Sequence, residues 1–538
     1  MISIMPKVLV ADEISPEGIE ILRKAVDVDY LPEVETSELL KIIPNYEGLL
    51  VRSRCKVTKE VIEKADKLRI VGRAGVGVDN IDLQAATEKG VLVINSPEGN
   101  TASASEHTLA LMMSLSRFIP AADASMKAGK WDRNQYLGSE LFNKTLGVVG
   151  LGKIGSRVAH AAQALGMKVI AYDPFMSAER AQELNVKLGS LDEIWSESDY
   201  ITLHTPKPRD TTGLINADVI KRMKPGVRIV NAARGGLIDE AALAEAIRDG
   251  KVAGAGLDVF SDEPLKDSPL RDLGAKLVLT PHLGASTEEA QFNVAIDTAE
   301  QISDYLTGKN VKSPVNLPSM RPEVMKQLGK FVWLAEAMAA IAGEFLQGNI
   351  REIDISIGGE LAQKDSSPLA TAALRGLFAS RMEGVTYVNA AIVAKNHGVN
   401  VKQSSFGASG ESELTLTLSG DNGESRLTGT IVAHDEPLIT RINDFPINLT
   451  PQRYMLFTSH RDQPGMVAKV AGILGQFDVN ISTMSVARRG AREDAVMVMG
   501  LDDPIQKSLL SKIDTADGIH LARFVSLDHL PREAVRLR

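Results

Sequence analysis

The sequence predicts a mixed α/β protein that is built from several domains. Three observations support this class. Two separate regions in the first half of the chain show alternating strand and helix patterns. A glycine-rich turn joins a strand to a helix near residue 150. From residue 454 onward the chain follows a strand–helix–strand–strand–helix–strand order. Alternation of strands and helices is typical of parallel sheets. At 538 residues the chain is long enough for three or four domains of about 150 residues each.

The first α/β region comprises residues 7–97. Ser15 and Pro16 favour the start of a helix, and Gly90 favours the end of another. Strands are expected at 7–12, 48–53, 68–75 and 91–97, with helices at 15–26, 58–66 and 80–90.

A second α/β region follows a long helix that is expected from Thr101 to Phe118. This helix is rich in Ala, Leu and Met, which suits a buried connecting helix or a subunit-packing helix. A helix over 287–308 should return to the first domain and make that domain discontinuous. Six strands are expected between them, at 146–150, 168–173, 200–206, 228–233, 254–259 and 277–281.

The glycine turn predicts a dinucleotide site. Gly150, Gly152 and Gly155 form G-x-G-x-x-G between a strand and a helix, so that backbone N–H groups can approach a pyrophosphate at the helix N-terminus. Asp173 ends the next strand, about 20 residues further on, where a carboxylate binds a ribose 2′-OH and repels a 2′-phosphate. This pattern indicates NAD rather than NADP. A doubly wound domain that binds another nucleotide is the alternative.

Composition argues against several classes of protein. The formal net charge is −9 and no long basic run occurs, which disfavours nucleic acid and anionic membranes as partners. Cys55 is the only cysteine, so no intrachain disulfide can form and a cytoplasmic location is expected. Neither a signal peptide nor a run of about 20 apolar residues is evident.

Three residues that follow strands of the second region could perform hydride-transfer chemistry. Arg234, Glu263 and His282 come after successive strands, and open α/β sheets bind ligands at the carboxyl ends of strands. Oxidation of a 2-hydroxy acid needs a base for the hydroxyl proton and a cation for the carboxylate, for which histidine and arginine are suited. Taken singly, each residue could be structural. We expect no metal ion at this site.

Four motifs resemble the D-2-hydroxyacid dehydrogenase family: GRAGVGVDNIDL, NAARGGLIDE, GAGLDVFSDEP and TPHLGAST. The resemblance implies a Rossmann-type NAD domain that is inserted in a flavodoxin-like substrate domain. It also implies that Arg234, Glu263 and His282 are catalytic. The implied cofactor-binding residues are Val76, Gly150, Gly152, Lys153, Ile154, Gly155, Asp173, Thr205, Ala232, Ala233, Arg234, Asp258, His282, Leu283, Gly284 and Ala285.

The whole chain is similar to the long members of this family, which oxidise 3-phospho-D-glycerate to 3-phosphohydroxypyruvate in the first step of phosphorylated L-serine biosynthesis. The implied domains are residues 1–99 with 288–318 for substrate, 100–287 for NAD, 319–450 as an α+β intervening regulatory domain, and 452–538 as a ferredoxin-like ACT domain. The implied substrate-binding residues are Arg52, Ser53, Arg73, Asn100, Arg234 and His282. The ACT domain would bind L-serine through His460, Asp462, Gly465 and Asn480, unless it is a purely structural dimer module.

Several alternatives stay open at this stage. The enzyme could act on glyoxylate, lactate or 2-oxoglutarate, or the chain could be an NAD-sensing, corepressor-like binding protein. The substrate and NAD domains should close on a hinge near 98–102 and 290–293. A homodimer or a homotetramer is expected because the long apolar helix and the half-exposed C-terminal sheet need partners. The sequence does not choose between these two assemblies.

Overall fold

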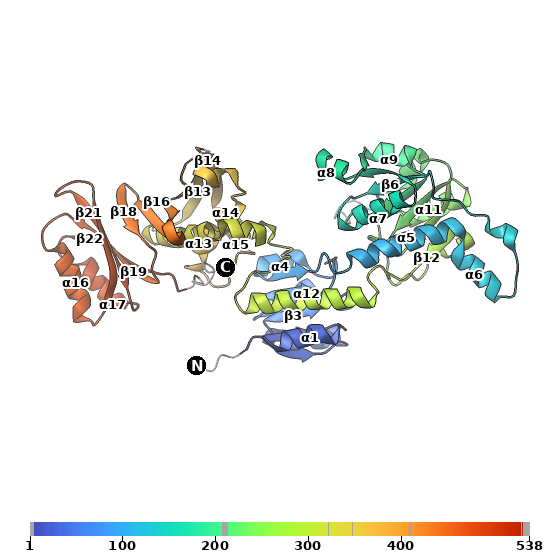
Figure 1. The fold of residues 1–538 in the computed structure, drawn as a ribbon. Helices are drawn as coiled ribbons and strands as arrows, with labels where there is room; N and C mark the ends of the chain where they lie inside the picture. The colour runs from blue at the N-terminus through green and yellow to red at the C-terminus, as the bar shows by residue number, and fades with distance from the viewer. Residues whose placement is uncertain are drawn as a thin grey trace.

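The computed structural model describes residues 5–206, 213–320, 322–346, 348–407, 410–528 and 530. Four sheets lie in these ranges (Figure 1), and the predicted mixed α/β fold class is confirmed. The domain boundaries given above stay a prediction. Their outermost parts, residues 1–4 and the residues from 531 onward, lie outside the described ranges.

The first sheet has five parallel strands in the order β2-β1-β3-β4-β5, which is the flavodoxin-like order. Sequence reasoning missed β2 and α2, because the edge strand Asp-Val-Asp-Tyr carries no apolar run. The elements are β1 (Lys7–Val10), α1 (Pro16–Arg23), β2 (Asp27–Tyr30), α2 (Thr36–Ile42), β3 (Gly48–Val51), α3 (Lys59–Lys64), β4 (Ile70–Arg73), α4 (Leu83–Lys89) and β5 (Leu92–Asn95).

Helix α12 (Glu288–Leu306) returns to this first sheet, as predicted, and lies beside α1 (Figure 1). Its fit is close, because a Cβ atom added to Gly18 of α1 would lie 3.0 Å from Cβ of Ala295. At Gly72 of β4 an added Cβ would lie only 2.6 Å from Cγ2 of Thr298. The sheet therefore tolerates no side chain at Gly72 where the helix crosses it.

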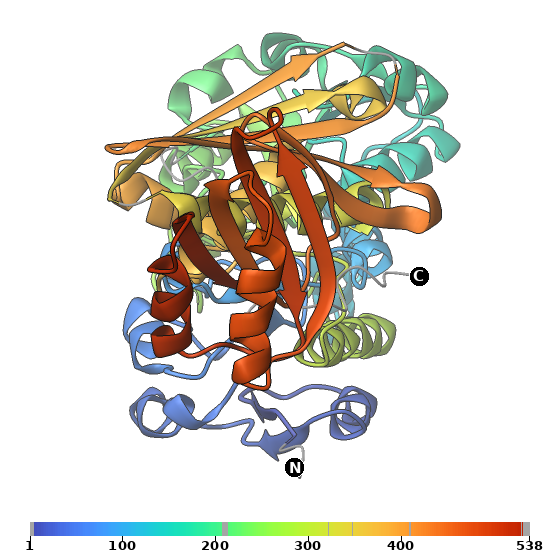
Figure 2. The ribbon, with the colours of Figure 1, turned by 90° about the vertical axis from the view of Figure 1, so that its left-hand side faces the viewer.

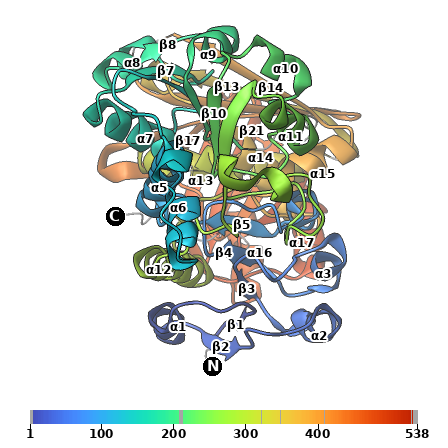
Figure 3. The same cartoon turned by 90° about the vertical axis from the view of Figure 1, so that its right-hand side faces the viewer.

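The second sheet has seven parallel strands in the order β12-β11-β10-β9-β6-β7-β8. It contains the six predicted strands and a two-residue edge strand, β8, that was not predicted. Helices α5 and α7 lie on one side of it, and α10 and α11 on the other (Figure 3). The strands are β6 (Thr145–Val149), β7 (Lys168–Tyr172), β8 (Lys187–Leu188), β9 (Tyr200–Leu203), β10 (Val227–Asn231), β11 (Val252–Leu257) and β12 (Leu277–Leu279).

The first helix of this second region is α5. Phe118, which has a left-handed backbone at φ 55°, separates it from α6. The predicted helix over 101–118 therefore corresponds to α5. The helices are α5 (Thr101–Arg117), α6 (Ile119–Lys127), α7 (Lys153–Ala164), α8 (Ala178–Glu183), α9 (Leu191–Glu197), α10 (Ala217–Arg222) and α11 (Glu240–Arg248).

The third sheet is mixed, with six strands in the order β14-β13-β15-β16-β17-β18. Strands β15 and β16 form a hairpin with a two-residue loop, Asp421 and Asn422, between the paired Gly420 and Gly423. The hydroxyl of Thr386 donates to the carbonyl of Gly90 at 3.0 Å and ties this region to the first sheet. The elements are α13 (Pro322–Phe345), β13 (Ile350–Gly358), α14 (Ser367–Ala379), α15 (Ala390–Asn396), β14 (Asn400–Phe406), β15 (Glu413–Gly420), β16 (Gly423–Val432), β17 (Glu436–Ile442) and β18 (Phe445–Leu449).

The fourth sheet has the predicted βαββαβ order, and its antiparallel strands lie in the order β20-β21-β19-β22. Both of its helices cover the same face (Figure 2). Phe457 meets Phe345 of α13 edge to face at 5.1 Å, which joins the third and fourth sheets. The elements are β19 (Tyr454–Arg461), α16 (Met466–Gln476), β20 (Ile481–Arg488), β21 (Asp494–Leu501), α17 (Lys507–Asp514) and β22 (Ile519–Ser526).

Short 3₁₀ helices complete the described elements, at η1 (Ile43–Asn45), η2 (Arg133–Tyr136), η3 (Arg271–Lys276), η4 (Pro318–Met320), η5 (Gly359–Gln363) and η6 (Ala433–Asp435). Within the described ranges, no helix has the length and apolar character that crossing a membrane requires.

Candidate active site

The candidate site lies where three neighbouring strands of the second sheet end. Strand β11 lies between β10 and β12, with Leu257 beside both Asn231 and Leu279. Because parallel strands place their carboxyl ends at one edge, the loops after these strands meet. They carry Arg234, Glu263 and His282, which the sequence singled out.

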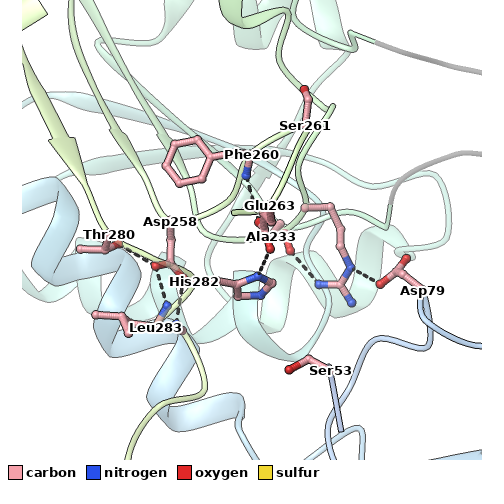
Figure 4. Close-up of polar contacts among 12 residues, drawn as sticks. Ser53, Asp79, Ala233, Asp258, Phe260, Ser261, Glu263, Thr280, His282 and Leu283 are labelled. Carbon is pink, nitrogen blue, oxygen red and sulfur yellow. Dashed lines mark hydrogen bonds and ion pairs between the residues drawn. The ribbon is translucent and has the colours of Figure 1, made fainter. Parts of the chain in front are cut away.

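His282 and Glu263 form a hydrogen-bonded pair (Figure 4). His282 Nδ1 lies 2.8 Å from Glu263 Oε2, and the N–H of Phe260 donates to Glu263 Oε1 at 3.0 Å. The bond to Glu263 raises the pKa of His282 above its ordinary value. Burial opposes ionisation of Glu263, but the bonds from His282 and Phe260 prevail and lower the pKa of its carboxyl. The histidine is therefore oriented, and its protonated form is stabilised.

The backbone of His282 is left-handed, at φ 58°, which a non-glycine residue rarely adopts. Asp258 holds this conformation through three successive N–H groups. His282 N donates to the carbonyl of Asp258 at 2.9 Å, while Leu283 N and Gly284 N donate to its carboxylate at 2.7 Å and 2.8 Å. Asp258 is fully buried, so the loop that carries His282 is held by a carboxylate that water does not reach.

Arg234 bridges the two α/β regions. Its Nε donates to Oδ2 of Asp79 at 3.0 Å, and its Nη1 donates to the carbonyl of Ala233 at 2.7 Å. The buried side chain of Asn231 braces this loop, since its Oδ1 accepts from Ala233 N at 3.0 Å and its Nδ2 donates to the carbonyl of Arg234 at 2.9 Å. Sequence reasoning missed Asp79 and Asn231, although both lie within motifs that it quoted.

Arg73 and Arg234 lie against the same glycine turn. A Cβ added to Gly75 would lie 1.6 Å from Arg73 Nη1, and one added to Gly77 would lie 2.1 Å from Arg234 Nη2. Burial, together with repulsion from Arg234 and Arg52, lowers the pKa of Arg73 to about 10. Arg52 and Arg234 are therefore both close enough to Arg73 to disfavour its charge, which is the electrostatic setting of an anion site.

Two buried polar atoms of the predicted substrate-binding residues have no partner in the described part of the chain. Nε of Arg73 and Oδ1 of Asn100, at the start of α5, find none among the described residues. Arg52 uses Nη1 to donate to the carbonyl of Glu13 at 3.2 Å. Ser53, which follows it, is exposed and lies on the same side of the site as Asp79 (Figure 4). Unsatisfied buried polar groups are costly, so they point to a polar ligand.

The glycine turn has the shape that a dinucleotide needs. Gly150 has φ 93°, and a Cβ added to Gly155 would lie 2.0 Å from the carbonyl oxygen of Gly150. A Cβ added to Gly152 would meet no atom within 4 Å, so the backbone there faces open space. A cavity of about 530 Å³ lies here, and Lys153, Ser156, Arg157, Met176 and Arg180 are among the residues that line it.

The donor set of this cavity fits a pyrophosphate, because its cations surround the N-terminus of the twelve-residue helix α7. Lys153 Nζ is paired at 2.5 Å with Glu98 Oε1. Asp173 accepts from Leu151 N at 2.8 Å, which ties its carboxylate to the glycine turn. Thr205 Oγ1 is buried without a partner in the described part of the chain. The remaining predicted cofactor residues are partly buried, Ile154 in the first turn of α7 and the others in loops: Val76, Ala232, Ala233 and Ala285.

The four predicted effector residues do not meet within one chain. His460, Asp462 and Gly465 lie where β19 ends and α16 begins, whereas Asn480 precedes β20. The register pairs Arg461 with Asp494 and Ile481 with Leu501, so Asn480 lies at the opposite end of β21, about 23 Å away at 3.3 Å per residue. The reason is that α16 carries the chain back across the sheet before β20 begins.

Two of these predicted effector-binding residues already form hydrogen bonds within the chain. Asp462 Oδ2 accepts from Arg488 Nη1 at 3.0 Å and from Arg492 N at 3.1 Å, and Asn480 Nδ2 donates to Asp502 at 2.6 Å. His460 is buried, which lowers its pKa, and its Nδ1 has no partner in the described structure.

Comparison with known proteins agrees with this geometry. The family model described as "D-isomer specific 2-hydroxyacid dehydrogenase, NAD binding domain" matches residues 109–284. The models "D-3-phosphoglycerate dehydrogenase intervening domain" and "ACT domain" match 327–443 and 454–517. A solved glyoxylate reductase from Paecilomyes thermophila is 28% identical, with a TM-score of 0.55 over 58% of this chain and 98% of its own. An NAD⁺-bound 3-phosphoglycerate dehydrogenase from Entamoeba histolytica is 29% identical, with a TM-score of 0.50 over 58% of this chain and 98% of its own.

Fold and site thus define an NAD-dependent oxidoreductase of the 2-hydroxyacid dehydrogenase class. Relatives named D-3-phosphoglycerate dehydrogenase match nearly the full length. The one from Synechocystis is 48% identical over 97% of this chain and 95% of its own, and the one from Archaeoglobus fulgidus is 42% identical over 97% and 100%. The chain belongs to the D-3-phosphoglycerate dehydrogenase family.

Two alanine substitutions in the glycine turn should have different effects on stability and on NADH binding. Gly152→Ala adds a methyl group to open space at a φ of −69° that alanine adopts, so the free energy of unfolding should change by less than about 0.5 kcal/mol. NADH affinity should nevertheless fall about tenfold or more, because the methyl group occupies the approach of the pyrophosphate. Gly155→Ala should instead cost about 1–3 kcal/mol of stability through overpacking. Thermal unfolding and NADH fluorescence titration measure both effects. Ordinary NADH binding by Gly152→Ala would contradict this placement of the pyrophosphate.

Proposed function

We propose that this protein oxidises 3-phospho-D-glycerate to 3-phosphohydroxypyruvate with NAD⁺, the first step of phosphorylated L-serine biosynthesis. The observation that carries the proposal is that Arg73 and Arg234 lie against the 75–77 turn, with Arg52 close enough to repel Arg73, near the His282–Glu263 pair. A substrate with a carboxylate and a phosphate would neutralise these arginines. The names of the full-length relatives support the same substrate.

The arginines and the His282–Glu263 pair would have different roles in this reaction. Arg234 and the backbone of the 75–77 turn would hold the substrate carboxylate, while Arg52 and Arg73 would hold its phosphate. His282 would accept the proton of the C2 hydroxyl, and Glu263 would stabilise the resulting imidazolium. NAD⁺, when bound, supplies the acceptor for the hydride that leaves C2. In the reverse direction His282 would return the proton.

Replacing Glu263 by Gln should move the pH dependence of the oxidation. His282 accepts a proton only when it is neutral, so kcat/KM rises with pH through its pKa, which Glu263 holds above the ordinary histidine value. Without the charge of Glu263 this pKa falls and the rise moves to lower pH. On the plateau kcat should drop about 10-fold to 100-fold, because the imidazolium loses its partner.

The matched control for this profile is Asp262→Asn, which alters the exposed neighbouring carboxylate and leaves the His282–Glu263 bond in place. Steady-state rates between about pH 6 and 10, which cover the ordinary histidine pKa of about 6.5 and the range above it, are sufficient. An unchanged profile in Glu263→Gln would show that Glu263 does not tune the base.

The phosphate assignment separates this substrate from other 2-hydroxy acids. Arg73→Met keeps most of the volume and removes the buried cation, so KM for 3-phospho-D-glycerate should rise about 10-fold to 100-fold with the loss of a charge-assisted bond. D-Glycerate, which lacks the phosphate, should be turned over poorly and equally by both proteins. An equal loss for both substrates would indicate that Arg73 supports the fold or the carboxylate instead.

The same assay would distinguish two alternative functions. Faster turnover of glyoxylate, D-lactate or 2-oxoglutarate would indicate another dehydrogenase of this fold. Tight NADH binding with no turnover of any of these acids would favour an NAD-sensing binding protein. A cytoplasmic location, a homodimer or homotetramer, and L-serine as the effector of the C-terminal domain remain predictions. The ACT family match favours an amino-acid effector.

A further inference from the structure

Helix α5 contacts the loop that carries His282. Ser103 and His107 are one helical turn apart and therefore share a face of α5. The hydroxyl of Ser103, which is buried, donates to the carbonyl of Gly284 at 2.9 Å. His107 Nε2 lies 3.1 Å from Asp258 Oδ1 and 3.0 Å from Thr280 Oγ1. Two adjacent turns of α5 thus reach the residues that precede and follow His282.

The tautomer of His107 follows from its neighbours. Thr280 donates its hydroxyl hydrogen to Asp258 Oδ1 at 2.6 Å, and an ionised carboxylate only accepts. The ring nitrogen that faces both oxygens must therefore carry a hydrogen. Burial opposes ionisation of Asp258, but the bonds from His107, Thr280 and Leu283 prevail and lower its pKa, so the carboxylate is the form present.

Within the described chain, His107 is the side-chain donor to Asp258 that comes from outside the 280–285 loop. Leu283 and Gly284 donate from the backbone of the loop itself, and Thr280 lies at the end of β12, where its N–H donates to the carbonyl of Leu257 at 3.0 Å. His107 adds a donor from helix α5, which restrains the Asp258 carboxylate from a second element besides the sheet. This restraint matters because His282 has a left-handed backbone that its surroundings must maintain.

We infer that His107 is a positioning residue for the base: by donating from Nε2 to Asp258 Oδ1, it fixes the carboxylate that holds the backbone of residues 282–284. Ser103 anchors the far side of the same loop through Gly284. The inference rests on the proposed role of His282, but the loop order that it describes does not depend on the substrate. His107 touches no reacting atom and acts through Asp258 and the loop.

The test compares three variants in the full-length protein. His107→Leu removes the donor, His107→Gln keeps an N–H donor of similar reach, and Glu106→Gln is the control on the adjacent exposed position. Amide hydrogen exchange reports the protection of Leu283 and Gly284, thermal unfolding reports the fold, and steady-state oxidation of 3-phospho-D-glycerate reports kcat and KM.

In His107→Leu, kcat should fall about 10-fold to 100-fold through misplacement of the base, while KM for 3-phospho-D-glycerate changes by less than about threefold. The amides of Leu283 and Gly284 should exchange faster. His107→Gln should recover most of the rate and the protection, and Glu106→Gln should match the unmodified protein. A purely structural role would lower the unfolding temperature without this split between kcat and KM and without rescue by Gln.

Unchanged exchange and kcat in His107→Leu would overturn the inference, as would equal impairment of the Leu and Gln variants. If His107→Leu does not fold, Ser103→Ala takes its place. This variant should show a smaller loss of hydrogen-exchange protection at Gly284 and a lower kcat. Unchanged protection and kcat in Ser103→Ala would also overturn the inference. If the unmodified protein does not oxidise 3-phospho-D-glycerate, the proposed function fails, and hydrogen exchange in the same variants decides the positioning role by itself.

Discussion

The candidate site depends on one buried carboxylate. Asp258 follows the central strand of the three whose ends form the site, and it accepts hydrogen bonds from the loop that carries His282. A buried charge is tolerated only when its hydrogen bonds are complete, and here the bonds that satisfy Asp258 also impose the left-handed backbone on His282. The hydrogen bonds that satisfy the buried charge of Asp258 are therefore the same ones that position His282, the proposed base.

The opposite wall of the site is organised by glycine. The turn after β4 has no side chains at positions 75 and 77, and Arg73 and Arg234 lie in the space that this leaves. One arginine comes from each α/β region, so the turn brings together charges that would otherwise stay apart. Asp79 orients Arg234 through Nε. A substrate that carries both a carboxylate and a phosphate would relieve the repulsion of Arg73 by the other arginines.

Much of this arrangement could be predicted from the sequence. Parallel α/β units place the ends of successive strands at one edge, so Arg234, Glu263 and His282 were expected to meet. The glycine turn and Asp173 were recognisable because only particular residues suit those positions. The edge strands β2 and β8 were missed because they are short and lack an apolar run. The roles of His107 and Asp79 could not be predicted from neighbouring residues, because the partners that these two side chains contact lie far along the chain.

The effector residues show where motif reasoning meets its limit. His460, Asp462 and Gly465 are neighbours in sequence and in space, whereas Asn480 was grouped with them by resemblance and lies at the other end of the sheet. Spacing along the chain does not reveal that a helix reverses direction between two such residues. The contact from Thr386 to Gly90, which joins the middle region to the first sheet, likewise has no signal in the local sequence.

The most direct measurement uses 3-phospho-D-glycerate that is deuterated at C2, with the unmodified protein and NAD⁺ in ordinary water. We expect one deuterium to be found in each NADH formed and a slower rate than with the unlabelled substrate, since the C2 hydrogen leaves as a hydride while His282 takes only the hydroxyl proton. Deuterium released to water, or no NADH from this substrate, would contradict the assignment of the site.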